Sequence, residues 1–202
     1  MNTWLNPTVE AYLSSFGKTK LPIVWEVGSR DGHDGYELAK RISSTGDMEL
    51  HLVEPNPAQA RVCEENYPNA HVYEVAASNA VGSAKFIVYE GDEGAVGSSS
   101  LDLNWKEGDL EGEIIHVKTD CLENMIGDEE IDIMKIDVEG HSMQVIEGLG
   151  DKLRQIKVLH IETEKWTDSN FKVKAFMHPR GFTLVDETEQ YGGMPDLLWV
   201  RG

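Results

Sequence analysis

The stretch Ile131-Asp-Ile-Met-Lys-Ile-Asp-Val-Glu-Gly-His141 constrains the fold of this chain more than any other. Its first half is mainly apolar, which is typical of a strand buried on both faces of a parallel sheet. Its second half places Asp137, Glu139 and His141 directly after that strand. Because ligands of open α/β sheets bind just beyond the carboxyl ends of the strands, these polar groups indicate a functional site. We therefore predict a central strand over residues 131–136 with a site at its carboxyl end.

The rest of the chain alternates between apolar runs of strand length and amphipathic segments of helix length. This alternation favours right-handed βαβ units, and hence an α/β fold with a mostly parallel central sheet and helices on both faces. Asn56 and Pro57 suit the N-cap and first position of a helix that ends by Pro68. Two final strands around a short glycine loop predict an antiparallel C-terminal strand. The other predicted strands cover residues 21–27, 49–54, 71–76, 157–162, 182–186 and 197–201, and the other predicted helices cover residues 7–16, 34–44, 142–155 and 167–178.

A long loop interrupts this alternation. Residues 83–89 and 113–118 alternate between apolar and polar side chains, which predicts a local ribbon of two strands. The loop that they flank, residues 90–112, is rich in Gly, Ser and acids and is too long for a simple connection. We interpret it as a substrate or lid loop. The 202 residues are predicted to form one domain, 1–202, with residues 1–20 as a helical extension.

The chain is strongly acidic, with a net charge of −18 and a pI near 4.7. Phosphates of nucleic acids and anionic membrane surfaces recruit Lys and Arg clusters, so we expect neither as a partner. Cys63 and Cys121 form neither a metal-type pair nor a disulfide framework. The N-terminus lacks a basic region followed by an apolar segment, and no apolar run approaches the ~20 residues that span a bilayer. We therefore expect a cytoplasmic protein.

A glycine turn follows the first predicted strand. In Glu26-Val-Gly-Ser-Arg-Asp-Gly32, the two glycines allow a sharp turn and a close approach to a ligand. Glu54 ends the second strand 22 residues after Gly32, a distance that suits a hydrogen bond to a ribose diol. The turn lacks the Gly-x-Gly-x-x-Gly pattern that seats a pyrophosphate, and the Glu26 carboxylate suits an ammonium group better than a phosphate. S-adenosylmethionine is the predicted cofactor, and an NAD-dependent sugar-modifying enzyme is an alternative.

Several motifs occur together in one order along the chain. They are Glu26-Val-Gly-Ser-Arg-Asp-Gly32, Val53-Glu-Pro-Asn56, Ala76-Ala-Ser78, Gly97-Ser-Ser-Ser-Leu101, Val117-Lys-Thr-Asp-Cys-Leu122 and Lys135-Ile-Asp-Val-Glu-Gly-His141. With this set, the chain from about Ile23 to the C-terminus resembles the FkbM family of S-adenosylmethionine-dependent methyltransferases. One departure is Ser142, which stands where members of the family commonly carry a charged residue.

The resemblance implies a Rossmann-like class I methyltransferase fold and methyl transfer to a hydroxyl, on a sugar or glycan or on a secondary metabolite. It also implies where the cofactor lies. Glu26, Gly28, Ser29 and Gly32 would flank its methionine end, Glu54 with Pro55 would hold its ribose, Ala77 and Ser78 would lie near its adenine, and Asp137 would face it.

Methyl transfer to a hydroxyl needs alignment of the acceptor and gains from a base within hydrogen-bond reach. Asp137 is the first candidate for this base, because it stands at the strand end that faces the cofactor. Glu139 and His141 are the next candidates, and an imidazole has a suitable pKa near ~6.5. Asp137 and His141 could instead cap the following helix, and for His141 the two interpretations have equal support.

The predicted substrate contacts come from other segments. Ser98, Ser99 and Ser100 could donate hydroxyl hydrogen bonds from the lid loop, and Trp166 offers an aromatic face for a sugar. Glu162 ends the fifth strand at the same sheet edge. Acidic strand ends occur often without a metal ion, so we predict no metal site. A protein that binds S-adenosylmethionine or a glycan without turnover is a further alternative.

Overall fold

The computed structural model describes residues 13, 17–89, 99–102, 112–164, 169–191 and 194–202. The predicted helix over residues 7–16 and most of the predicted lid loop lie outside these residues. Leu13 is described, and its side chain is buried against the helices and strands that follow. Within the described ranges, no helix has both the length and the apolar character needed to cross a membrane.

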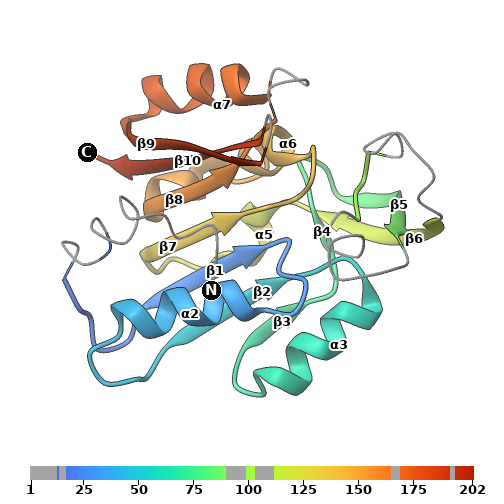
Figure 1. Ribbon diagram of the computed structural model, residues 1–202, viewed down its shortest axis with the longest axis horizontal. Helices are drawn as coiled ribbons and strands as arrows, with labels where there is room; N and C mark the ends of the chain where they lie inside the picture. Colours follow the sequence, from blue (N-terminus) through green and yellow to red (C-terminus); the bar gives the residue numbers. More distant parts are fainter. Residues whose placement is uncertain (1–12, 14–16, 90–98, 103–111, 165–168, 192–193) are drawn as a thin grey trace.

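The described strands form a central sheet in the order β3-β2-β1-β7-β8-β10-β9 (Figure 1). Neighbouring strands from β3 to β8 run parallel, and β10 is antiparallel to both β8 and β9. The predicted mostly parallel sheet with an antiparallel C-terminal strand is therefore confirmed. The strands are β1 (Ile23–Val27), β2 (Glu49–Val53), β3 (His71–Tyr73), β7 (Ile131–Ile136), β8 (Ile156–Glu162), β9 (Phe182–Tyr191) and β10 (Met194–Arg201).

Strand β7 is buried along its whole length, as its apolar sequence predicts. Its register pairs Val27 of β1 with Ile136, so that the two strands end level with each other. Gly28 and Asp137 consequently leave the sheet side by side. The backbone N–H of Asp137 donates to the carbonyl of Val27 at 2.9 Å, which continues the ladder one residue beyond the strands.

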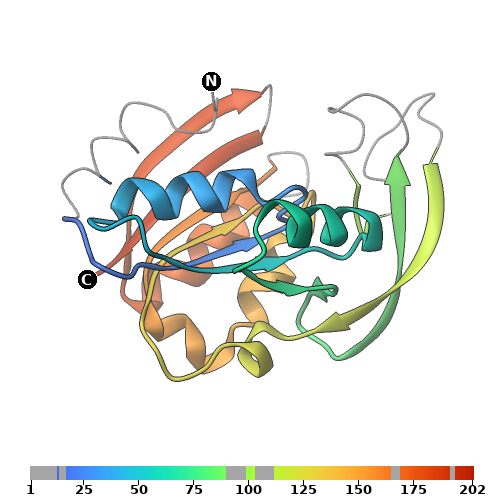
Figure 2. The same ribbon diagram turned by 90° about the horizontal axis from the view of Figure 1, so that it is seen from below.

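Helices cover both faces of the central sheet (Figure 2). One face packs against α2 and α3 through side chains such as Val24, Leu38 and Ile133. The opposite face packs against α5, α6 and α7 through Trp25, Met134 and Val145, among others. The α-helices are α2 (His33–Ile42), α3 (Pro57–Asn66), α5 (Leu122–Met125), α6 (Ser142–Glu147) and α7 (Ser169–Met177), and short 3₁₀ helices are η1 (Gly150–Gln155) and η2 (His178–Arg180).

A second sheet, β4-β6-β5, lies beyond the carboxyl ends of the parallel strands (Figure 1). Its antiparallel pair, β5 (Gly82–Tyr89) with β6 (Gly112–Asp120), confirms the predicted ribbon. The predicted single strand over residues 71–76 is wrong. The chain turns after Tyr73, and β4 (Ala76–Ala77) pairs in parallel with β6 instead. Only two residues separate the two short segments, so local pattern does not show that they belong to two sheets.

The predicted helix over residues 142–155 is also shorter than expected. It ends after Glu147, and a 3₁₀ turn follows from Gly150, whose φ of +50° lies in the left-handed region. Glycine tolerates this conformation, which ends the α-helix although the apolar spacing continues. The last two strands are longer than predicted, because they pair with each other beyond the limits of their apolar runs.

Candidate functional site

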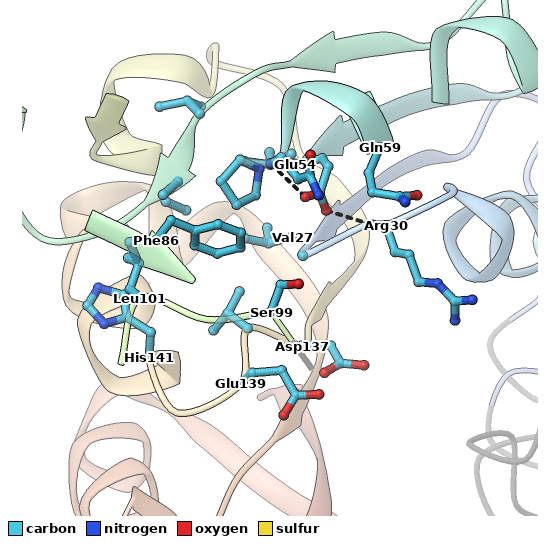
Figure 3. A pocket seen from close by; sticks show the side chains of 18 residues that line it. Val27, Arg30, Glu54, Gln59, Phe86, Ser99, Leu101, Asp137, Glu139 and His141 are labelled. Carbon is cyan, nitrogen blue, oxygen red and sulfur yellow. Dashed lines mark hydrogen bonds between the residues drawn. The ribbon is translucent and has the colours of Figure 1, made fainter. Parts of the chain in front are cut away.

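A pocket opens where β1, β2 and β7 end, and residues of the second sheet form one of its walls (Figure 3). Its position agrees with the rule that ligands of α/β sheets bind at the carboxyl ends of the strands. In Figure 3, Glu54 lies on one side of the pocket, and Asp137 and Glu139 lie on the other. The lining residues are Val27, Gly28, Arg30, Val53, Glu54, Pro55, Asn56, Gln59, Val75, Ala76, Ala77, Phe86, Ser99, Leu101, Asp137, Val138, Glu139 and His141.

The glycine turn is held tightly against two neighbouring strands. Gly28 and Ser29 donate their N–H groups to the carbonyl of Val53, at 2.9 and 3.2 Å. Gly28 has a φ of +80°, and a Cβ at this position would lie 1.8 Å from the carbonyl oxygen of Asp137. The sequence predicts that Gly28 allows a close approach to a ligand. The structure adds that the backbone of β7 is the group that approaches it.

Glu54 is buried at the pocket wall, and backbone donors hold its carboxylate. Its Oε2 accepts the N–H of Arg30 at 2.8 Å, and its Oε1 accepts the N–H of Asn56 at 2.8 Å. Burial raises the pKa of Glu54 to about 7, against the opposing effect of these two hydrogen bonds. Each carboxylate oxygen has a second lone pair, so Glu54 can accept further hydrogen bonds from a ligand hydroxyl.

A buried lysine connects the first strand to Asp137. The Nζ of Lys135 lies 2.8 Å from Asp34, 3.0 Å from Asp137 and 3.8 Å from Glu26. Glu26 also accepts the N–H of Gly35 at 2.9 Å. Burial alone would lower the pKa of Lys135, but the three carboxylates outweigh burial and raise it well above its ordinary value. The ammonium of Lys135 therefore stays charged and holds the Asp137 carboxylate in place.

Three carboxyl groups meet on the other side of Asp137. One oxygen each of Asp137, Glu139 and Glu162 lies within 4.8 Å of the others. Burial, with repulsion by Asp137 and Glu139, raises the pKa of Glu162 far above its ordinary value. Glu162 consequently keeps its proton at neutral pH, and the cluster carries less negative charge than its composition indicates.

His141 faces the pocket and does not cap the following helix. It occupies the N-cap position of α6 but forms no capping hydrogen bond through its side chain. Its Nε2 lies 3.0 Å from the hydroxyl of Ser78, beyond β4. Burial lowers the pKa of His141, so the neutral imidazole predominates at neutral pH. The alternative interpretation of His141 as a helix cap is therefore wrong.

The second sheet is tied to the turn after β7. Ser100 exchanges two backbone hydrogen bonds with Ile87 of β5, at 2.9 and 3.1 Å. Its hydroxyl donates to the backbone carbonyl of Glu139 at 2.6 Å. Glu139 itself has a φ of +46°, in the left-handed region that is uncommon outside glycine. This connection fixes the pocket wall that contains Phe86 and Ser99.

The structure brings half of the sixteen predicted site residues into the lining of the pocket. Those that line it are Gly28, Glu54, Pro55, Ala77, Ser99, Asp137, Glu139 and His141. Those that lie behind or beside the lining are Glu26, Ser29, Gly32, Ser78, Ser100 and Glu162. Ser98 and Trp166 lie outside the described residues. In particular, the Glu26 carboxylate, which the sequence predicts beside an ammonium of the cofactor, faces Lys135.

Sequence reasoning missed several lining residues. Arg30, Asn56 and Val138 stand inside the motifs 26–32, 53–56 and 135–141. Their place beside predicted site residues was the signal that could have identified them as lining residues. Gln59 lies on the first turn of α3, and helical geometry places it near Glu54. Phe86 lies on the second sheet, and no pattern near it indicates a ligand.

A family model described as "Methyltransferase FkbM domain" matches residues 26–191. The matched segment contains all of the motifs on which the resemblance rests. No protein in the curated set matches the chain at the sequence level.

Solved methyltransferase structures share the fold at low sequence identity. Methyltransferase FkbM from Methylobacillus flagellatus KT is 11% identical with a TM-score of 0.59, over 89% of this chain and 44% of that one. Precorrin-6y C5,15-methyltransferase from Geobacter metallireducens GS-15 is 12% identical with a TM-score of 0.52, over 98% and 90% of the two chains. M. capricolum TrmK, solved with S-adenosylhomocysteine, is 9% identical with a TM-score of 0.50, over 95% and 66%. The present chain thus spans less than half the length of the Methylobacillus flagellatus protein.

Proposed function

Because the chain belongs to the FkbM methyltransferase family, whose cofactor is S-adenosylmethionine, we propose that it transfers a methyl group to a hydroxyl of a sugar, glycan or secondary metabolite. The observation that carries the proposal is the pocket that joins Glu54 of the second strand end to Asp137 of the central strand end. It combines a carboxylate suited to a ribose diol with a second carboxylate suited to an acceptor hydroxyl.

The residues of the pocket fit the cofactor by their chemistry. Glu54 is oriented by two backbone N–H groups and has lone pairs left for ribose hydroxyls. Pro55, Ala77 and Phe86 provide apolar surface for an adenine ring. Gly28 leaves its backbone exposed in the pocket without a side chain, next to Asp137. We assign the methionine end to the side of Gly28 and Asp137.

When bound, S-adenosylmethionine supplies an already activated methyl group, so the protein mainly aligns the acceptor and excludes water. We assign Asp137 as the group that orients the acceptor hydroxyl and accepts its proton. The ammonium of Lys135 pairs with this carboxylate at 3.0 Å and holds it in position. Glu139 lines the same side of the pocket and extends the acceptor site.

His141 is the second candidate for the base. Its imidazole is neutral at neutral pH because burial lowers its pKa, and its Nε2 is engaged by Ser78 at 3.0 Å. Glu162, which keeps its proton, can donate a hydrogen bond toward the acceptor side of the cluster. Ser99 lines the pocket and offers a hydroxyl to the acceptor.

Titration calorimetry with S-adenosylmethionine, S-adenosylhomocysteine and NAD tests the cofactor assignment. We expect saturable binding of the first two and none of NAD. Release of S-adenosylhomocysteine in the presence of a panel of sugars, glycans and hydroxylated metabolites then tests turnover. Binding without release across panels of hydroxyl, amine and thiol acceptors favours a protein that binds without turnover. Release with amines alone would contradict the assignment of a hydroxyl acceptor.

A further inference from the structure

A second cluster of functional groups lies at the opposite end of the central sheet from the pocket. Glu49 is the first residue of β2, His71 is the first residue of β3, and His51 is paired with His71 across the two strands. Because these strands are parallel, their first residues lie at the amino edge, whereas the pocket lies at the carboxyl edge. The cluster therefore plays no part in the proposed methyl transfer.

The three side chains offer nitrogen and oxygen ligands at short separations. One ligand atom from each of Glu49, His51 and His71 lies within 4.8 Å of the others. His51 Nε2 and Glu49 Oε1 are 3.1 Å apart. Two ligands bound to one Zn²⁺ at about 2.0–2.1 Å in tetrahedral geometry are separated by roughly the same distance. The pair is thus already spaced as two ligands of a single ion.

His71 can complete the set by a small movement. Its ring stacks on His51 with a centroid distance of 4.7 Å, and its side chain is exposed on the edge strand β3. An exposed imidazole can change rotamer without disturbing the core. Glu49 is also partly exposed, so water or a fourth ligand can reach the same point.

The core holds His51 in place for this role. Its ring is 5% exposed and stacks on Trp25 at a centroid distance of 4.2 Å. Its Nδ1 lies 3.0 Å from the hydroxyl of Tyr73. Metal-binding histidines usually engage their second nitrogen with such a partner, which fixes the ring and its tautomer.

From these contacts, we propose that Glu49, His51 and His71 form a binding site for a divalent transition-metal ion of the Zn²⁺ or Ni²⁺ type. Two imidazoles and one carboxylate suit such ions, whereas Mg²⁺ and Ca²⁺ prefer oxygen ligands alone. Without the ion, a proton between His51 Nε2 and Glu49 makes the 3.1 Å contact. When the ion binds Nε2, that proton moves to Nδ1, where the hydroxyl of Tyr73 accepts it, so the ring stays neutral and no net proton is released. The ion then joins the edge strand β3 to β2.

Calorimetric titration of the chelator-treated full chain with Zn²⁺ tests the site. We expect one strong binding event in the wild-type protein and none of comparable strength with Mg²⁺. The variant His71→Ala should lose this event, because it removes one of the two imidazoles. The exposed His116→Ala on β6 is the matched control and should bind as the wild type does. Equal Zn²⁺ affinity in the wild-type protein and His71→Ala would overturn the site, as would no wild-type binding.

A second variant and a second measurement exclude a mere loss of folding. Tyr73→Phe keeps the ring and removes the hydroxyl next to His51 Nδ1, and it should weaken Zn²⁺ binding about 10–100-fold. At about 100 times the dissociation constant, Zn²⁺ should raise the melting temperature of the wild-type protein by about 5–10 °C. The melting temperature of His71→Ala should match that of the wild type without Zn²⁺ and should not rise with it. A rise of the same size in both proteins would contradict the proposal.

Discussion

Asp137 has an ammonium on one side and carboxyl groups on the other. Lys135 lies 3.0 Å from its Oδ2, whereas Glu139 and Glu162 each place an oxygen within 4.8 Å of it. The ammonium of Lys135 forms an ion pair with Asp137, and proton retention by Glu162 limits the repulsion within the cluster. At the scale of single residues, the ion pair with Lys135 and the proton on Glu162 together allow the Asp137 carboxylate to face the pocket beside two other acidic side chains.

Replacement of Asp137 tests its role in turnover. Asp137→Asn keeps the size of the side chain but removes the proposed base, so turnover should fall by about 10²–10⁴-fold. The measurement is the rate of S-adenosylhomocysteine release at saturating cofactor, with circular dichroism to verify the fold. Asp128→Asn, on a fully exposed side chain far from the pocket, is the control and should retain the wild-type rate. Turnover of Asp137→Asn close to that of the wild type would transfer the role of base to His141.

Replacement of Glu54 tests the position of the ribose. Glu54→Gln retains the shape of the side chain but replaces a charged acceptor by a neutral amide. Hydrogen bonds to charged groups contribute about 1.5–3 kcal/mol, so S-adenosylmethionine should bind roughly 10–100-fold more weakly. Calorimetry measures the affinity, and Glu64→Gln, at an exposed position on the following helix α3, is the control. An unchanged affinity in Glu54→Gln would place the ribose elsewhere.

At the scale of elements, the junction of β1 with β7 determines the shape of the pocket. The two strands end level, and the turn after β1 leaves no room for a side chain next to the Asp137 carbonyl. Gly28 is therefore required by the packing of two strands as well as by its φ of +80°. A displacement of the turn at Gly28 would therefore also displace Asp137.

Two glycine variants separate these two requirements. Gly46 has a φ of +91°, but a Cβ there would have nothing within 4 Å, so Gly46→Ala should cost only about 1–2 kcal/mol of backbone strain. A Cβ at Gly28 would also collide with the Asp137 carbonyl at 1.8 Å. Gly28→Ala should therefore reduce the free energy of unfolding clearly more than Gly46→Ala does. Urea denaturation measures both, and equal losses would show that the backbone of β7 yields easily at this junction.

The elements also show which local patterns predict structure and which do not. The mainly apolar run of β7 predicted its bounds correctly, because burial on both faces leaves no alternative for a short run between polar ends. The run from His71 to Ala76 was misassigned, because pairing with β6 divides it between two sheets. Ser142, where the resemblance departs from the family, is buried and donates to the carbonyl of Glu162 at 2.8 Å. A hydroxyl satisfies this contact without a buried charge.

At the scale of the whole molecule, the net charge of −18 coexists with buried carboxyl groups in the pocket region. Burial raises the pKa of Glu26 to about 8 and that of Glu54 to about 7. The folded protein therefore binds protons that the unfolded chain releases near pH 4.5. The contribution of Glu54 to stability is fully present below that pH and is lost as the pH rises through about 7.

This linkage predicts a pH-dependent difference between the wild-type protein and Glu54→Gln in the absence of cofactor. Gln does not titrate, so the wild-type protein should lose roughly 2–3 kcal/mol relative to the variant between pH 4.5 and pH 8. Urea denaturation at several pH values measures the free energy of unfolding of both proteins. The other titratable groups are the same in both, so their contributions cancel in the difference. A difference for Glu54→Gln that is constant, or that grows in the opposite direction, would disprove the raised pKa.

The α/β class, the central strand, the glycine turn, the position of Glu54 and the family can all be predicted from the amino-acid sequence. Each of these features depends on the order of apolar and polar residues within a short stretch or on the spacing between motifs. Both properties can be read directly from the sequence. Within the candidate site, it predicted Gly28, Glu54 and Asp137 at one pocket, because the carboxyl ends of parallel strands meet at one edge.

Only the tertiary structure decided which groups face one another across strands. It placed Lys135 between Glu26 and Asp137, moved Phe86 to the pocket wall, and brought His51 next to His71. These contacts depend on strand order, register and the division of the chain between two sheets. Such properties arise from the packing of distant segments, and no local stretch of sequence specifies them.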